Sequence, residues 1–291
     1  MKRRPTADRG GGAGAVRAKR SLGQNFLVDK NVARKIVAAL KAAPGDLVLE
    51  IGPGRGALTH VLADLPGVRL AALEKDAALA AALKAELPGA GVVVADALGF
   101  AWEGLASAGP LRIIGNLPYN VASPIIWELV ARCPHFARAV FMIQREVAER
   151  LCAMPGSGAY GGLTAWVRSF VAPELLFRVG PEVFRPRPKV ESAVVAFTPL
   201  PAAERAADPQ NLAAVIKQCF TWRRKQLQNI LKAFPAGVAE RFFAAEQIKP
   251  TARPEELSPR KFQALAACYR SVAEAVEQAA PPAGPEGSSG P

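Results

Sequence analysis

Four consecutive residues, Asn116, Leu117, Pro118 and Tyr119, have the side chains needed for chemistry on the amino group of a nucleobase. The Asn116 side-chain oxygen and the Leu117 backbone carbonyl can accept the two hydrogens of an exocyclic amine, which frees the nitrogen lone pair from the ring. Pro118 fixes the turn, and Tyr119 can stack on an unstacked base, a contact worth about 1–3 kcal/mol. A turn with Asn and Pro at their favoured positions is the simpler alternative.

A glycine-rich loop with the sequence GPGRGA spans residues 52–57 and follows the apolar run 47–51. Such loops let a ligand approach the backbone at a helix N-terminus, but this spelling also fits a dinucleotide site. Glu74, about 20 residues after the loop, suits ribose hydroxyls in either case. Glu50 repels a pyrophosphate but tolerates a cation, and Asp96 can accept from an adenine amine. Together these three acids suit S-adenosylmethionine, whose sulfonium is positive. The alternative is that they are simple strand-end caps, and we favour the cofactor interpretation.

The elements around these residues alternate between short apolar runs and helical segments. We expect strands over residues 47–51, 68–73, 92–95, 111–114 and 139–143, and helices over 57–65, 77–87 and 124–131. Another helix begins after Asp29, which can cap it. Strands 175–179 and 190–197 have no helix between them and should pair antiparallel. The fold class is therefore α/β, with a Rossmann-like methyltransferase sheet and an antiparallel final strand.

The chain becomes helical after residue 205, with candidate helices over 211–220, 225–234, 238–246 and 259–269. We therefore predict a methyltransferase domain over 21–200 and a small all-helical, RNA-contacting domain over 205–271. Residues 1–20 and 272–291 contain too few bulky apolar residues to build a core, so we expect both tails to be disordered.

The net charge of +12 indicates a polyanionic partner, nucleic acid before membrane. The sequence has no apolar run long enough for a transmembrane helix and no signal-peptide pattern. Four scattered cysteines indicate reduced thiols in a cytoplasmic compartment, and with two histidines they make a metal site improbable. We expect a monomer that binds no metal.

Seven motifs in one order give the chain a specific family resemblance. They are GQNFL at 23–27, LEIGPGRGALT at 49–59, LEKD at 73–76, ADAL at 95–98, NLPYN at 116–120, FRPRPKVESAV at 184–194 and RRKQLQN at 223–229. Over about residues 21–270 the chain resembles the ribosomal small-subunit adenine dimethyltransferases, the kasugamycin-sensitivity methyltransferases. The resemblance implies transfer of four methyl groups from S-adenosylmethionine to two adjacent adenosines near the 3′ end of 16S rRNA, during 30S assembly. It implies a cofactor site lined by Asn25, Leu27, Gly52, Glu74, Asp96 and Asn116.

Two basic segments are candidate RNA contacts. Arg185, Arg187 and Lys189 flank Phe184, so Phe184 could cover the other face of a flipped adenine as a fifth catalytic residue. The cluster Arg223, Arg224 and Lys225 follows Trp222, and we expect it at a helix start, where a phosphate would offset charges that oppose the dipole. A solvated loop and a solvated charge run are the respective alternatives.

The chain departs from the family at two places, with Lys75-Asp76 where Asp-Arg is usual and Gly162 where Arg is usual. Lys75 could alter the cofactor's rim. Three other functions compete with the family's own. They are methylation of large-subunit rRNA, dinucleotide-dependent oxidoreduction, and a non-catalytic assembly or transcription factor of the same fold.

Overall fold

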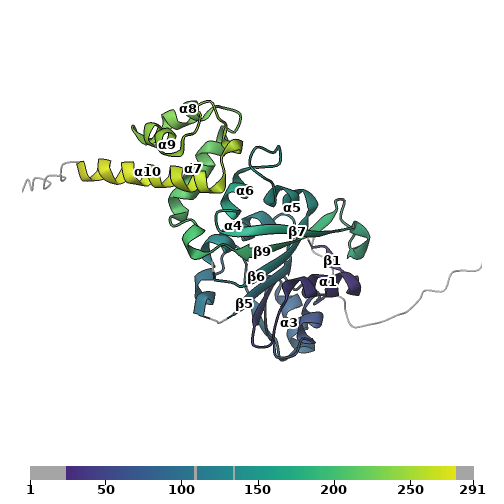
Figure 1. Cartoon of the computed structure of the whole chain (residues 1–291). Helices are drawn as coiled ribbons and strands as arrows, with labels where there is room; N and C mark the ends of the chain where they lie inside the picture. Colours follow the sequence, from purple (N-terminus) through teal and green to yellow (C-terminus); the bar gives the residue numbers. More distant parts are fainter. Residues whose placement is uncertain (1–23, 108–109, 134, 280–291) are drawn as a thin grey trace, which may run out of the picture.

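The computed structural model describes residues 24–107, 110–133 and 135–279, and its centre is a seven-stranded sheet (Figure 1). The strand order is β4-β3-β2-β5-β6-β9-β7. The five strands β2 to β6 run parallel, while β9 is antiparallel to both β6 and β7. This confirms the predicted α/β class. The strands are β2 Leu47–Ile51, β3 Arg69–Glu74, β4 Gly91–Val94, β5 Leu111–Asn116, β6 Arg138–Gln144, β7 Val171–Val179 and β9 Ser192–Pro199.

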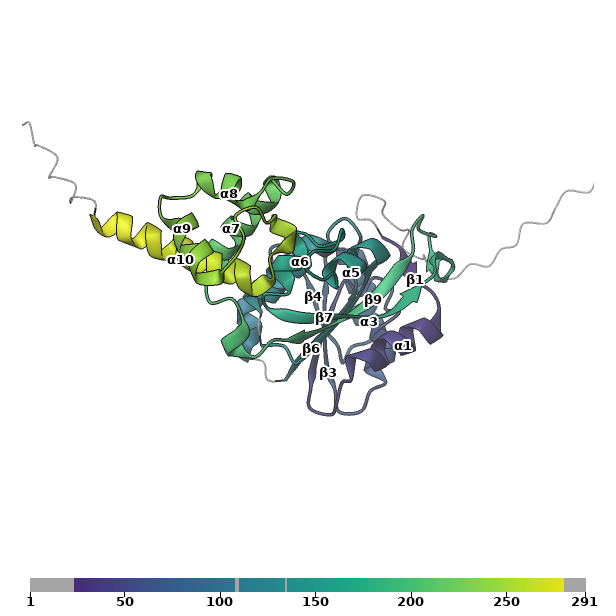
Figure 2. The ribbon, with the colours of Figure 1, turned by 45° about the horizontal axis from the view of Figure 1, so that its top comes forward.

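Helices cover the two faces of this sheet, and apolar side chains fill the space between the layers. Helix α1 packs on β5, β6 and β9, and α5 packs on β6, β7 and β9 (Figure 2). The Asp29 carboxylate caps α1 as expected, accepting from the backbone N–H groups of Asn31 and Val32 at 2.8 and 3.0 Å. The helices are α1 Lys30–Leu40, α2 Thr59–Ala63, α3 Ala77–Glu86, α4 Ala122–Arg132, α5 Arg145–Leu151 and α6 Gly162–Val167, with a 3₁₀ turn at Trp102–Ser107.

A separate two-stranded sheet joins distant parts of the chain. Strand β1 (Phe26–Leu27) pairs antiparallel with β8 (Phe184–Arg185), which follows a 3₁₀ turn at Pro181–Val183. The Val28 N–H extends the ladder by donating to the Val183 carbonyl at 2.9 Å. The segment before α1 is thereby tied to the proline-rich loop that follows β8. We did not predict this pairing, because two-residue strands have no periodicity to detect.

The C-terminal part is helical, as predicted, but two element boundaries differ. The segment predicted as one helix over 225–234 is two short pieces, and α10 continues into the tail that we expected to be disordered from residue 272. Val272 on this extension is buried, and its Ala- and Glu-rich sequence favours helix. The elements are α7 Pro209–Thr221, α8 Leu227–Ile230, α9 Val238–Glu246 and α10 Pro259–Ala279, with 3₁₀ turns at Ala202–Glu204, Leu231–Ala233 and Pro254–Glu256. The predicted tail 1–20 lies outside the described residues.

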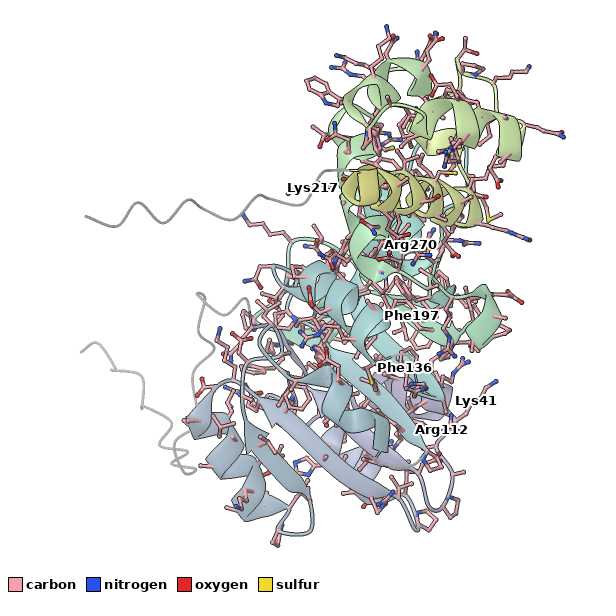
Figure 3. The ribbon with its side chains drawn as sticks, turned by 90° about the vertical axis from the view of Figure 1, so that its left-hand side faces the viewer. Lys41, Arg112, Phe136, Phe197, Lys217 and Arg270 are labelled. Atoms are coloured by element: carbon pink, nitrogen blue, oxygen red, sulfur yellow. The ribbon has the colours of Figure 1, made fainter. Side chains whose placement is uncertain are left out.

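The helical part shares its core with the α/β part. The Phe220 ring on α7 lies 5.7 Å from Phe262 on α10 and 6.3 Å from Tyr160, which precedes α6. In Figure 3 the helical part, marked by Lys217 and Arg270, lies at one end of the molecule, and Arg112 lies toward the other. Arg112 is ion-paired there with Asp46 and donates to the Leu40 carbonyl at 2.9 Å. The continuous core fixes the helices against the sheet.

Candidate active site

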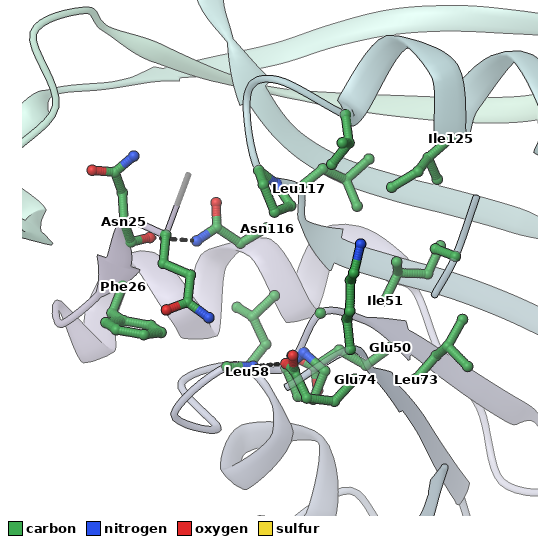
Figure 4. A pocket seen from close by; sticks show the side chains of 18 of the residues that line it. Asn25, Phe26, Glu50, Ile51, Leu58, Leu73, Glu74, Asn116, Leu117 and Ile125 are labelled. Carbon is green, nitrogen blue, oxygen red and sulfur yellow. Dashed lines mark hydrogen bonds between the residues drawn. The ribbon is translucent and has the colours of Figure 1, made fainter. Parts of the chain in front are cut away.

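A cavity opens at the carboxyl ends of β2, β3 and β5, where the strand order reverses and where ligands of such sheets bind. It is lined by residues 24–27, by much of 50–58, by 73–75, by 95–97, and by 116–121 with Ile125 of α4 (Figure 4). The structure brings together every residue predicted for the cofactor, namely Asn25, Leu27, Gly52, Glu74, Asp96 and Asn116. It also brings Leu117, Pro118 and Tyr119 to the same cavity.

The loop after β2 turns sharply because Gly52, Gly54 and Gly56 all have positive φ angles, between 57° and 78°. A side chain at Gly54 would also meet the Phe26 ring, 3.1 Å from the place of its Cβ. The Arg55 guanidinium also contacts this ring, because it lies over Phe26 at 4.6 Å from the ring centroid. Strand β1 therefore covers the glycine loop.

Glu74 holds this loop in place. Its carboxylate is buried and accepts from the Gly54 N–H at 3.0 Å and from the Asp76 N–H at 2.8 Å. Each carboxylate oxygen has a second lone pair, so the side chain can still accept from a ribose hydroxyl. Glu74 therefore has a structural contact in addition to the cofactor role that we expected from its spacing.

Asp96 is paired with a residue that departs from the family pattern. The Lys75 ammonium lies 2.7 Å from one carboxylate oxygen of Asp96, and the Leu98 N–H donates to the other at 3.1 Å. The hydrogen bond from Lys75, together with that from Leu98, lowers the pKa of Asp96. The Lys75 ammonium therefore offsets the charge of one of the three acids at the cavity; its effect on the cofactor stays a prediction.

Glu50 is the deepest acid of the cavity, with 1% of its surface exposed. Burial raises the pKa of its carboxyl to about 8; the Thr59 hydroxyl opposes this shift, and the negative charge of Glu74 adds to it. In the described part of the chain, its Oε2 atom has no hydrogen-bond partner. A buried, unpaired carboxyl oxygen at the cavity wall is a suitable partner for a cationic ligand and a poor one for a pyrophosphate. The site therefore fits S-adenosylmethionine.

Asn116 is oriented by the backbone carbonyl of Asn25, the residue that precedes β1. Its Nδ2 donates to the Asn25 carbonyl at 3.1 Å, and Figure 4 shows the amide oxygen turned away from that contact. If the amide were flipped, its oxygen would face the Asn25 carbonyl oxygen, and two acceptors would repel each other. The next carbonyl, that of Leu117, accepts no hydrogen bond within the described residues, whereas the Pro118 carbonyl accepts from Val121 and Ala122 of the following helix. The site thus presents two acceptors side by side in sequence.

Tyr119 is held by a side-chain contact with β9. Its hydroxyl lies 2.7 Å from the hydroxyl of Ser192, the buried first residue of β9. Burial raises the pKa of Tyr119, and the hydrogen bond with Ser192 opposes that shift. The preceding Gly115 allows β5 to approach β2, because a Cβ there would lie 2.7 Å from the Ile51 carbonyl. The tyrosine ring therefore has a fixed position at the cavity wall.

Phe184 is not part of the cavity, and the prediction that its ring covers the second face of the adenine is wrong. Its side chain is fully buried in the core cluster that contains Leu27 and Val194. The cause is the β1–β8 pairing, which places Phe184 opposite Leu27 and turns its ring toward the sheet. Without knowledge of that pairing, an apolar core residue and a stacking residue have the same appearance in the sequence.

The predicted RNA contacts are exposed or partly exposed, in two separate places. Arg185 donates to the Glu182 and Phe184 carbonyls at 2.9 and 2.8 Å. Arg187 and Lys189 are exposed and have no hydrogen bond or ion pair among the described residues.

The second cluster, Arg223 to Lys225, lies in the turn after α7 and before α8. Cations at that C-terminal end of α7 are favoured by the helix dipole, so our argument from an opposed dipole is wrong.

Sequence reasoning missed the partners that position the site. Ser192, Phe26 and Arg55 make the contacts described above. Each lies within one of the seven motifs, but we assigned functional roles only to other residues of those motifs. The hydroxyl of Ser192 and the aromatic ring of Phe26, next to Asn25, were the only features of the sequence that could have pointed to these contacts.

The strand order, the glycine loop, the buried Glu50 and the Asn-Leu-Pro-Tyr segment define a Rossmann-like methyltransferase that uses S-adenosylmethionine. The family model described as ribosomal RNA adenine dimethylase matches residues 15–270. The chain belongs to this family, and it is an S-adenosylmethionine-dependent ribosomal RNA adenine dimethyltransferase.

The chain is similar over most of its length to bacterial proteins named ribosomal RNA small subunit methyltransferase A. It is 50% identical to the one from Maridesulfovibrio salexigens, over 88% of this chain and 96% of that protein. It is 51% identical to the one from Nitratidesulfovibrio vulgaris, over 86% and 95%.

Two solved structures have similar folds. A dimethyladenosine transferase from Plasmodium falciparum has a TM-score of 0.70 at 24% identity, over 85% of this chain and 98% of that one. The 23S rRNA methyltransferase ErmE has a TM-score of 0.62 at 26% identity, over 84% and 100%.

The described residues show neither a metal site nor a membrane span. They contain no group of three or more His, Cys, Asp or Glu side chains arranged to hold a metal ion. None of the helices described is long and apolar enough to cross a membrane.

Proposed function

We propose that this enzyme dimethylates the N6 amines of two adjacent adenosines in the hairpin loop near the 3′ end of 16S rRNA. The observation that carries this proposal is the pair of acceptors at the end of β5, the fixed Asn116 amide oxygen and the Leu117 carbonyl, which accepts no hydrogen bond from the described residues. An exocyclic amine has two hydrogens for these two acceptors. The half-identical relatives named for the small subunit support the choice of substrate.

S-adenosylmethionine supplies an electrophilic methyl group. The protein's contribution is to prepare the amine. Hydrogen bonds from N6 to Asn116 and Leu117 localise the nitrogen lone pair, so that it can form the new bond to carbon as the bond from carbon to sulfur breaks. Preorganised acceptors of this kind typically contribute 10²–10³-fold in rate. The N6 proton leaves to solvent after transfer, so the site needs no strong base.

Tyr119 provides the surface on which the adenine rests. Its hydroxyl bond to Ser192 fixes the ring plane before the base arrives, so less ordering entropy is lost on binding. The adenine must leave its stack to reach this ring, because a base paired in a helix cannot present its amine to a cavity.

The substrate in this proposal is an assembling 30S particle in the cytoplasm, and the enzyme acts as a monomer. The exposed cations Arg187 and Lys189 lie on the loop after β8. Strand β8 pairs with β1, and β1 covers the glycine loop of the cofactor site. Phosphates bound by these cations would contact the loop that leaves the small sheet, whose strand β1 directly follows Asn25, the residue that orients Asn116. The net charge of +12 supports binding to a large polyanion.

The test is methyl transfer to purified ribosomal subunits. Small and large subunits from cells lacking the modification are incubated separately with labelled S-adenosylmethionine, and the methyl groups are located by mass spectrometry of rRNA fragments. We expect N6,N6-dimethylation of two adjacent adenosines in small subunits only, and none with Asn116→Ala. Methylation confined to large subunits would assign the substrate of ErmE-type enzymes instead. An absence of transfer to either subunit would support a non-catalytic factor.

A further inference from the structure

Trp222 is an exposed aromatic residue outside the active-site cavity. It lies in the turn between α7 and α8, and 47% of its surface is exposed. The chain has four tryptophans, and the other three are packed inside. Trp102 and Trp166 are buried, and Trp127 stacks on Trp166 with ring centroids 4.2 Å apart. Trp222 is thus the tryptophan of this chain whose ring is most accessible to a ligand.

One face of this ring is already occupied by a cation. The Lys225 ammonium lies 4.1 Å from the Trp222 ring centroid, and the Lys225 N–H donates to the Trp222 carbonyl at 2.8 Å. These contacts close a tight turn and hold the indole in one orientation. A ligand that stacks on the open face would therefore lose little entropy in ordering the ring.

The two neighbouring arginines differ in what they bind. Arg223 donates to the Gly158 carbonyl at 2.9 Å and lies 3.9 Å from Glu255, so it joins the turn to the loop before α6. Arg224 is exposed and, within the described residues, makes no hydrogen bond or ion pair. Arg224 and Lys225 thus remain as exposed positive charges beside the indole.

We propose that the open face of Trp222 stacks on an unpaired base of the RNA substrate, while Arg224 and Lys225 bind the adjacent phosphates. An aromatic face flanked by cations is the combination that binds single-stranded nucleic acid. The indole has polar neighbours in sequence, because Thr221, Arg224 and Lys225 are all exposed, so it is no apolar patch for a protein partner. A paired base offers no free face to an indole, so the base must come from a loop, bulge or single strand.

This contact is separate from the methylated adenosine. None of the residues from Trp222 to Lys225 lines the active-site cavity. The inference rests on the proposed function for the identity of the RNA, and it adds a second recognition point on the helical part of the enzyme. It assigns Trp222 to affinity for the substrate and not to the transfer step.

The first experiment uses tryptophan fluorescence with a short single-stranded oligouridylate as the probe. Since stacking is tolerant of sequence, binding should quench the emission of the exposed Trp222. The matched control is Trp222→Phe, which keeps a ring but removes the reporter, so the emission of the other three tryptophans, which pack in or against the core, should show no change. A blunt-ended RNA duplex should leave the wild-type emission unchanged. Equal quenching of the wild type and Trp222→Phe would overturn the proposal.

The second experiment measures affinity for unmethylated small subunits across a salt series. Trp222→Ala should weaken binding roughly five- to hundred-fold, Trp222→Phe by a much smaller factor, and neither should change the log–log salt slope. Arg224→Ala should lower that slope by roughly 0.7–0.9. Unchanged affinity in Trp222→Ala would refute the stacking contact.

Methyl transfer at saturating subunit concentration distinguishes the two proposals. We expect Trp222→Ala to keep the wild-type kcat and to raise KM. If the wild type transfers methyl groups but Trp222→Ala shows no change in KM, only this inference fails. If the wild type transfers none, the proposed function fails, and the fluorescence result still decides whether the turn binds single-stranded RNA.

Discussion

The raised pKa of Glu50 makes the stability of the free enzyme depend on pH in a specific way. The pKa of this carboxyl is about 8 in the folded protein, against an ordinary value of 4.5. Between these values the unfolded chain has lost the proton that the folded protein retains. The free energy of unfolding attributable to Glu50 is therefore fully present below pH 4.5 and decreases as pH rises toward 8.

The magnitude follows from proton linkage. Each pH unit within this window removes about 1.4 kcal/mol, so from pH 5.5 to 7.5 the loss is about 3 kcal/mol. Glu50→Gln has nearly the same shape and does not titrate. We therefore expect this variant to become progressively more stable than the wild type as pH rises through the window, and to differ by a nearly constant amount above pH 8.

The assay is urea unfolding of both proteins, free of cofactor, at a series of pH values. All other titrating groups are common to both, so their contributions cancel in the difference. Glu146→Gln serves as the matched control because its side chain is 81% exposed in a surface ion pair, and its difference from the wild type should stay flat. A flat difference for Glu50→Gln as well would refute the assignment of a buried, protonated carboxyl.

The same carboxyl should give up its proton when a cation binds beside it. At pH 7 a group with a pKa of about 8 is roughly nine-tenths protonated, so cofactor binding should release close to one proton from Glu50. Calorimetry in buffers of different ionisation enthalpy measures this release. The release measured for Glu50→Gln should be smaller by that amount, and equal release would place the cationic part of the cofactor elsewhere.

Three further predictions concern the transfer step and the RNA contacts. Asn116→Ala should reduce turnover by about 10²–10³-fold while calorimetry shows cofactor affinity largely intact, and turnover within a few-fold of wild type would refute the amine-accepting role. Tyr119→Phe leaves the buried Ser192 hydroxyl without its partner, at a cost of about 1–3 kcal/mol in the free energy of unfolding, yet keeps a stacking ring. It should therefore reduce turnover less than Tyr119→Ala does, and equal losses would show that the ring itself contributes nothing. Because Arg223 is held by Gly158 and Glu255, Arg223→Ala should lower the thermal midpoint, whereas Arg224→Ala should leave it unchanged; the opposite ranking in a thermal melt would contradict these assignments.

Much of the fold could be predicted because short-range hydrophobic patterns in the sequence indicate its strands and helices. The apolar runs that end at Ile51, Glu74 and Asn116 locate the strands within about two residues, and their carboxyl ends meet at one edge by the rule for parallel sheets. That Glu50, Glu74 and Asn116 line one cavity was therefore predictable from the order of strands and helices.

The contacts that were missed depend on long-range pairing. Phe184 is buried because it lies opposite Leu27, more than 150 residues earlier in the chain. No local sequence pattern at either position predicts that the two residues pair. The Ser192 bond to Tyr119 and the Lys75 bond to Asp96 likewise join different elements. We expected Arg223 to Lys225 at the start of a helix over 225–234, but α8 begins at Leu227, and helix ends are the least certain part of a periodicity argument.

If Asn116 and Leu117 accept the amine hydrogens as proposed, the direction of the Asn116 amide also decides which bases stay in the cavity and when they leave it. Two acceptors repel a base that carries a carbonyl at the same position, so guanine and inosine are rejected where adenine is held. Each methyl transfer then removes one hydrogen that the acceptors were using. A dimethylated amine has none, and it leaves Asn116 and Leu117 facing methyl groups with their hydrogen bonds unmade, at a cost of about 1–3 kcal/mol for each buried acceptor. In this proposal, the same geometry that captures the substrate weakens the binding of the finished product.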